Sequence, residues 1–128
     1  MRYNFIYNKR KIIVEVTIKI NNEIKKLNFI VDIGASTSVI DEDTARFLGF
    51  SADKLEKANY HTAGGRTSGK ILKLPSFGIF NEVFYNCEIA IINLSPFVTF
   101  YCEGLIGNDI LEKLKKLKID CIEKTIEV

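Results

Sequence analysis

Phe29-Ile-Val-Asp-Ile-Gly-Ala-Ser-Thr37 is the stretch of sequence that decides the fold of this chain. Apolar residues at alternate positions lead up to Asp32, which is the pattern of a strand with one face in a core. The residues that follow, Gly34, Ala35 and Ser36, are small, so another loop can approach this backbone closely. Taken alone, the segment also fits an ordinary turn, because Asp and Gly are common turn residues. Other parts of the sequence must distinguish a functional carboxylate from a turn.

The rest of the chain is dominated by strand patterns. Residues 11–20 are rich in β-branched residues that alternate with polar ones, and 23–31 returns after an Asn-Asn turn as the second strand of a hairpin. Gly64-Gly65 is expected at the tip of a later hairpin, while Pro75 and Gly78 predict a break after it. Further strands are expected at 2–7, 37–40, 58–63, 67–74, 82–92, 97–101, 117–121 and 125–128.

Two short helices are also predicted. The first covers 41–49, with Asp41 as N-cap and Gly49 as the stop signal. The second covers 108–117, with Asn108 as N-cap and leucines facing inward. Without a linker or a repeat, the sequence predicts one mostly-β domain over residues 1–128.

Composition narrows the function classes. The formal net charge is +2, which predicts no strong attraction to nucleic acid or to an anionic membrane. No apolar run approaches the roughly 20 residues that span a bilayer, and the first residues do not resemble a signal peptide, so we expect a cytoplasmic protein. Cys87, Cys102 and Cys121 are an odd number without close pairing, which favours buried reduced thiols. With a single histidine, a zinc site is not expected, and no metal or other cofactor is predicted.

A second motif supports a functional role for Asp32. Gly104-Leu-Ile-Gly107, followed by Asn-Asp-Ile-Leu111, is a tight apolar segment that leads directly into a helix. Val31-Asp-Ile-Gly-Ala-Ser36 resembles the Asp-Thr/Ser-Gly-Ala active-site loop of retropepsin-like aspartic peptidases, and the 104–111 segment resembles the hydrophobic-hydrophobic-Gly segment behind that loop. The hairpin around Thr62-Ala-Gly-Gly65 lies where this family carries its flap. The resemblance spans nearly the whole chain and is typical of single-domain bacterial members.

The resemblance implies a closed retropepsin-like acid-protease β-barrel with two short helices, completed as a homodimer. Each protomer would supply Asp32 to a catalytic dyad that hydrolyses peptide bonds in a peptide or protein substrate. The other residues that it assigns are Ile33, Gly34, Ala35 and Ser36 in the active-site loop, Thr62, Ala63, Gly64 and Gly65 in the flap, and Leu105, Ile106 and Gly107 in the supporting motif.

Ile33 departs from the family pattern, which has Thr or Ser at this position. In the family, that hydroxyl bonds across the dimer axis to the partner's loop. Isoleucine can neither donate nor accept, and a buried group left without its partner costs about 1–3 kcal/mol. Two Ile33 side chains packed against each other would recover part of this by apolar burial. The alternative function is therefore a catalytically impaired retropepsin-fold module for dimerisation or peptide binding.

Other polar residues support weaker hypotheses. The hydroxyls of 36–38 have no histidine base near them in sequence, which argues against a serine hydrolase. Tyr60 and His61 are candidates to line a substrate groove, although His61 is better explained as exposed and neutral. Asp109 and Asp120 are expected to be structural acids. A small β-barrel that binds nucleic acid is a third possibility that the charge pattern disfavours.

Overall fold

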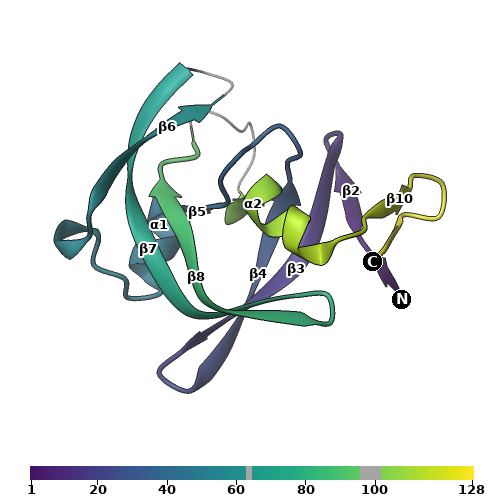
Figure 1. Cartoon of the computed structure of the whole chain (residues 1–128), viewed down its shortest axis with the longest axis horizontal. Helices are drawn as coiled ribbons and strands as arrows, with labels where there is room; N and C mark the ends of the chain where they lie inside the picture. The colour runs from purple at the N-terminus through teal and green to yellow at the C-terminus, as the bar shows by residue number, and fades with distance from the viewer. Residues whose placement is uncertain (63–64, 96–101) are drawn as a thin grey trace.

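The computed structural model describes residues 1–62, 65–95 and 102–128. Strands dominate this part of the chain (Figure 1). They are β1 Arg2–Asn4, β2 Ile6–Asn8, β3 Lys11–Ile20, β4 Glu23–Val31, β5 Val39–Asp41, β6 Lys57–Thr62, β7 Gly65–Ile79, β8 Glu82–Ile92, β9 Gly104–Ile106, β10 Lys118–Asp120 and β11 Thr125–Glu127. The helices are α1 Glu42–Phe47 and α2 Asn108–Leu111, with 3-10 turns η1 Ala52–Lys54 and η2 Glu112–Leu114. The strand predicted at 97–101 lies outside the described residues.

The β3–β4 hairpin has the bounds predicted from its sequence pattern. Its two strands pair from Ile13↔Ile30 to Ile20↔Glu23. Asn21 and Asn22 both take positive φ, 49° and 66°, as a two-residue hairpin turn requires. Asparagine tolerates this conformation, so the turn fixes the register that buries the apolar face of β4.

Six strands close into a barrel. Around the larger sheet, β3 pairs with β4, and the order continues β4-β9-β5-β8-β7. β7 then pairs back with β3 at Val16↔Ile79, Thr17↔Gly78 and Ile18↔Phe77. The predicted mostly-β closed fold with two short helices is confirmed. Closure leaves the six strands around one core, in which the fully buried rings of Phe29 and Phe77 lie 5.8 Å apart.

β9 is inserted between two strands that are close in sequence. It runs parallel to β4, with Ile30↔Leu105 in register, and antiparallel to β5, with Ile40↔Gly104. The chain from 32 to 38 must therefore pass around the end of β9 to reach β5. A side chain at Gly104 would force its neighbours to move, because a Cβ there would lie 2.3 Å from Cζ of Phe29 and 2.5 Å from the Val39 oxygen.

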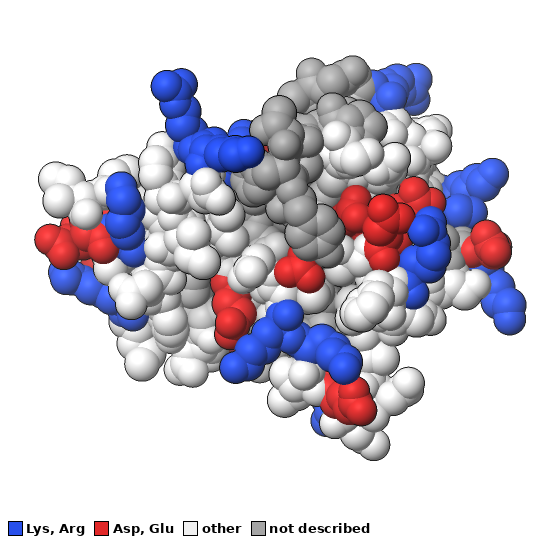
Figure 2. Space-filling view, turned by 180° about the vertical axis from the view of Figure 1, so that it is seen from behind, with Lys and Arg blue, Asp and Glu red and all other residues white. Residues whose placement is uncertain are grey.

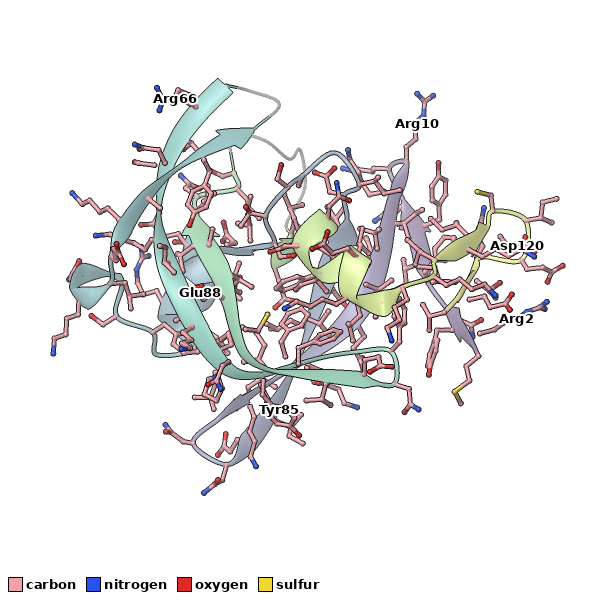
Figure 3. All side chains as sticks on the ribbon, in the orientation of Figure 1. Arg2, Arg10, Arg66, Tyr85, Glu88 and Asp120 are labelled. Atoms are coloured by element: carbon pink, nitrogen blue, oxygen red, sulfur yellow. The ribbon has the colours of Figure 1, made fainter. Side chains whose placement is uncertain are left out.

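A small sheet joins the chain ends. Its strand order is β1-β11-β10, and the Met1 amino group donates to the Val128 oxygen at 3.2 Å. Both ends of the chain lie on the same side of the molecule (Figure 1). Arg2 and Asp120 lie on this side as well (Figure 3). Asp120 is a structural acid as predicted, because its Oδ1 accepts from the backbone N–H groups of Glu123 and Ile122 in the turn after β10. These hydrogen bonds and the charge of Arg2 lower the pKa of Asp120.

The predicted break at Pro75 and Gly78 was wrong, because β7 runs through both. Leu74↔Cys87 and Ser76↔Tyr85 are paired on either side of Pro75, and the facing Asn86 takes a φ of 52°. The ladder is thus irregular where proline cannot donate. Gly78 lies against β3, and a Cβ there would displace the Thr17 hydroxyl.

The second helix is shorter than predicted. α2 ends at Leu111 and continues as the single turn η2, after which Lys115 takes a φ of 67°. Its N-cap is Gly107 rather than Asn108, and the cap has no side-chain hydrogen bond. In the first helix, by contrast, Asp41 is the N-cap as predicted and accepts from the Asp43 N–H.

Candidate active site

Asp32 lies directly after β4, where the chain leaves the barrel to pass around β9. Its backbone N–H donates to the Ile106 oxygen at 2.9 Å, so the strand pairing extends as far as this residue. Its side chain is partly buried, and Oδ1 accepts from the Gly34 N–H at 3.1 Å. The backbone carbonyl oxygen of Asp32 accepts from the Ala35 N–H at 3.1 Å, which closes a tight turn. The carboxylate is therefore held by its own loop and keeps an accessible face.

The Gly-Leu-Ile-Gly segment supports this loop from behind, through the backbone. The Asn108 N–H donates to the Ala35 oxygen at 2.8 Å, and the Asp109 N–H donates to the Ser36 oxygen at 3.2 Å. Gly107 is needed for this approach, since a Cβ would lie 2.8 Å from the Thr37 carbonyl carbon. Ile106 is fully buried in the barrel core. Leu105 packs against a second apolar cluster, which contains Ile30 and Val39. The two motifs identified in the sequence thus meet in space.

Ser38 and Asp109 form a polar network that the sequence did not reveal. Ser38 is completely buried, and its Oγ donates to Asp109 Oδ1 at 2.7 Å and accepts from the Gly107 N–H at 2.8 Å. The Asp109 carboxylate also accepts from the N–H groups of Ser38 and Ile110. This network ties the end of the loop to the start of α2. Asp109 is a structural acid as predicted, whereas the Ser38 hydroxyl was considered only as one of three possible nucleophiles.

Ile33 and Asn108 meet at the surface of the loop. The Ile33 side chain is 59% exposed. Its backbone oxygen accepts a hydrogen bond of 2.7 Å from the Asn108 side-chain amide. Ile33, which departs from the family pattern, therefore has a hydrogen-bonded backbone oxygen and an exposed apolar side chain.

The glycine-tipped hairpin is formed by β6 and β7. The pairing runs from Lys57↔Lys70 to Thr62↔Gly65, and the predicted tip residues Ala63 and Gly64 lie outside the described residues. The tip end of this hairpin and the loop after β4 lie toward the same end of the molecule (Figure 1). That placement is compatible with a flap.

Tyr60 lies on β6 and packs against the apolar cluster that contains Ile30 and Val39. Burial raises the pKa of its phenol, and the negative charge of Glu88 adds to this. The phenol is therefore neutral at physiological pH. Its ring packs under the middle of the hairpin as a half-buried apolar group with a polar end.

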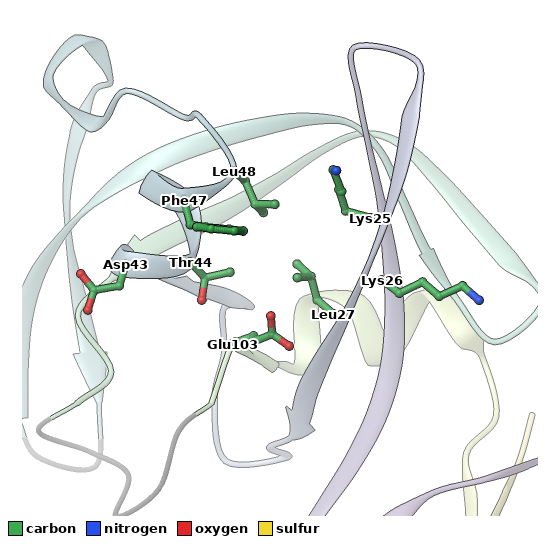
Figure 4. A pocket seen from close by; sticks show the side chains of 8 residues that line it. All are labelled: Lys25, Lys26, Leu27, Asp43, Thr44, Phe47, Leu48 and Glu103. Atoms are coloured by element: carbon green, nitrogen blue, oxygen red, sulfur yellow. The ribbon is translucent and has the colours of Figure 1, made fainter.

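A separate hollow of about 480 Å³ lies between α1 and β4, and it contains none of the loop residues (Figure 4). It is lined by Lys25, Lys26, Leu27, Asp43, Thr44, Phe47, Leu48 and Glu103.

On the face shown in Figure 2, basic and acidic side chains are interspersed. Within residues 1–62, 65–95 and 102–128, no group of three or more His, Cys, Asp or Glu residues is placed to hold a metal ion. No helix in the same part of the chain is long and apolar enough to span a membrane.

Comparison with known proteins agrees with this geometry. Residues 15–110 match the family described as aspartyl protease, a range that includes Asp32 and the segment behind it. The chain belongs to the aspartyl protease family. The structure is similar to that of a retropepsin-like aspartic protease from Rickettsia conorii, with a TM-score of 0.71 and 24% identity over 98% of this chain and 88% of the other. A search of curated proteins gave no match.

Proposed function

We propose that the protein is a homodimeric aspartic endopeptidase in which each protomer, a single domain over residues 1–128, contributes Asp32. The observation that carries this proposal is the mounting of the Asp32 carboxylate. It lies at the end of a core strand, with one oxygen bonded to the Gly34 N–H and its loop supported by the 106–109 segment. The described part of the chain contains one such loop, so a dyad of two aspartates requires a second copy of the chain.

The chemistry of such a dyad follows from its charge. Two carboxylates a few ångströms apart do not both ionise readily, so they share one proton. The ionised aspartate takes a proton from a bound water, which attacks the scissile carbonyl carbon, while the protonated aspartate donates a hydrogen bond to the carbonyl oxygen. Proton transfer to the leaving nitrogen then breaks the C–N bond. We propose that an extended peptide lies between this floor and a flap that includes Thr62, Ala63, Gly64 and Gly65.

The decisive experiment is the comparison of Asp32→Asn with the wild-type chain on a peptide library between acidic and neutral pH. Asparagine keeps the acceptor for the Gly34 N–H but cannot take a proton, so we expect kcat/KM to fall by about 10²–10⁴ or more. Asp53→Asn, a neutralised exposed acid in η1, is the matched control and should keep full activity. Cleavage that survives Asp32→Asn would overturn the proposal.

The exposed Ile33 side chain favours one alternative, a retropepsin-fold module without catalysis. Ile33→Thr separates the two functions. Peptidase activity that is absent from the wild type and present in Ile33→Thr would establish the impaired module. Equal activity in both chains would show that isoleucine at this position does not impair the site. Sedimentation equilibrium on both proteins measures the dimer affinity separately from activity.

A further inference from the structure

We propose that Asn108 is a positioning residue that sets the orientation of the Asp32 carboxylate from within the same chain. This inference deepens the proposed function and rests on it for its catalytic consequence. Asn108 does not touch the carboxylate itself. It acts through the peptide group between Ile33 and Gly34.

The contact runs through a single planar unit. The Asn108 side-chain amide donates to the Ile33 carbonyl oxygen at 2.7 Å. The same peptide group carries the Gly34 N–H, which donates to Asp32 Oδ1 at 3.1 Å. Because a peptide group is planar, fixing the direction of its C=O also fixes the direction of its N–H. The two hydrogen bonds also polarise each other through that group.

Asn108 makes a second bond to the same loop. Its backbone N–H donates to the Ala35 oxygen at 2.8 Å. One residue therefore holds the carbonyl oxygens on both sides of Gly34. Since Asn108 is not the N-cap of α2, its side chain is free of the usual role of asparagine at a helix start.

Residue 33 supplies no side-chain anchor of its own. A hydroxyl at position 33 could anchor the loop, but isoleucine has no polar side-chain atom. The side-chain anchor of this peptide group therefore comes from Asn108. Asn108 is exposed, so its amide adds little to the core and acts chiefly on the geometry of the loop.

The test compares Asn108→Ala and Asn108→Asp with the wild type in steady-state kinetics. Asp has the size of Asn but no N–H to donate. We expect kcat to fall about 10-fold in both variants, with KM within about 2-fold, because misplacement affects the transition state more than substrate binding. Asn81→Ala, in the exposed turn between β7 and β8, is the control and should leave both constants unchanged.

Ile33→Thr supplies a double-mutant cycle. With a hydroxyl at position 33, the loop gains an alternative anchor, so Asn108→Ala should lower kcat by no more than about 2-fold in that background. An equal loss in both backgrounds would overturn the positioning role. So would an unchanged kcat in the wild-type background, or an increase in KM alone.

A measurement that does not need activity separates this inference from the proposed function. Amide hydrogen exchange of Gly34 should accelerate about 10-fold in Asn108→Ala, while exchange in the core strand β4 stays the same. If the wild type cleaves nothing and Gly34 still responds in this way, the positioning contact stands and the peptidase proposal fails. If Gly34 exchange is unchanged, the positioning contact is refuted whatever the activity.

Discussion

Replacing Ser38 by alanine tests whether the loop depends on the buried polar network behind it. The Ser38 hydroxyl is completely buried, and it donates to Asp109 at 2.7 Å and accepts from the Gly107 N–H at 2.8 Å. Alanine keeps the backbone and nearly the same volume, so the change removes two hydrogen bonds without opening a large cavity. The change in the free energy of unfolding should therefore reflect the loss of these hydrogen bonds rather than a change in packing.

The magnitude follows from the partners that are left behind. The Gly107 N–H loses its acceptor in a buried site, which costs about 1–3 kcal/mol. Loss of the charge-assisted bond to Asp109 adds about 1.5–3 kcal/mol before compensation. Compensation is substantial, because the carboxylate keeps the N–H groups of Ser38 and Ile110. We therefore expect a decrease of about 2–4 kcal/mol in the free energy of unfolding.

Urea denaturation at fixed protein concentration measures this difference, provided that the m-value is the same in both proteins. Ser36→Ala is the matched control, since Ser36 lies in the same loop with an exposed side chain, and it should stay within about 0.5 kcal/mol of the wild type. A loss below about 1 kcal/mol for Ser38→Ala would refute the assigned role. An equal loss for Ser36→Ala would show that the loop, and not the network, is sensitive.

Two further outcomes follow from close packing and from thiol burial. Gly104→Ala should lower the free energy of unfolding by about 3 kcal/mol in the same urea assay, because its Cβ would overlap Phe29 at 2.3 Å; an unchanged midpoint would contradict this. The thiols should react unequally with Ellman's reagent: exposed Cys121 reacts in the native protein, whereas Cys87 and Cys102, whose pKa values burial raises, react only after denaturation. Rapid reaction of all three thiols in the native protein would refute this.

The sequence predicted well what depends on neighbouring residues. The strands at 11–20, 23–31 and 82–92 have their predicted bounds, because alternation and the turns between them are local signals. The first helix has Asp41 as its N-cap as expected, for the same reason. The prediction that all three cysteines are buried was wrong for Cys121, which lies in the turn between β10 and β11.

The failures arose where distant residues decide the structure. Pro75 is accommodated by the unusual backbone of Asn86 on β8, and Gly78 by its approach to Thr17 on β3. The bond between Ser38 and Asp109 joins residues 71 positions apart, which no local pattern could indicate. In the candidate site, the family resemblance pointed to the loop of Asp32 and to the Gly-Leu-Ile-Gly segment behind it. The side chains that fix the loop became visible only in three dimensions.

The contact from Asn108 also changes how the lost hydroxyl bond at Ile33 weighs against the burial of its apolar side chain. Its backbone oxygen is not left without a partner, because Asn108 donates to it at 2.7 Å, so the penalty expected for a missing hydroxyl does not arise at that atom. The lost hydroxyl bond itself is worth about 0.5–1.5 kcal/mol. Full burial of an isoleucine side chain contributes about 1.5–3 kcal/mol, and 59% of this side chain is still exposed, so covering it with a second protomer would contribute about 1–2 kcal/mol. The two terms are of similar size. In the proposed dimer, isoleucine at position 33 is therefore compatible with stable association, and the anchor that we propose for the loop, Asn108, lies within the same chain.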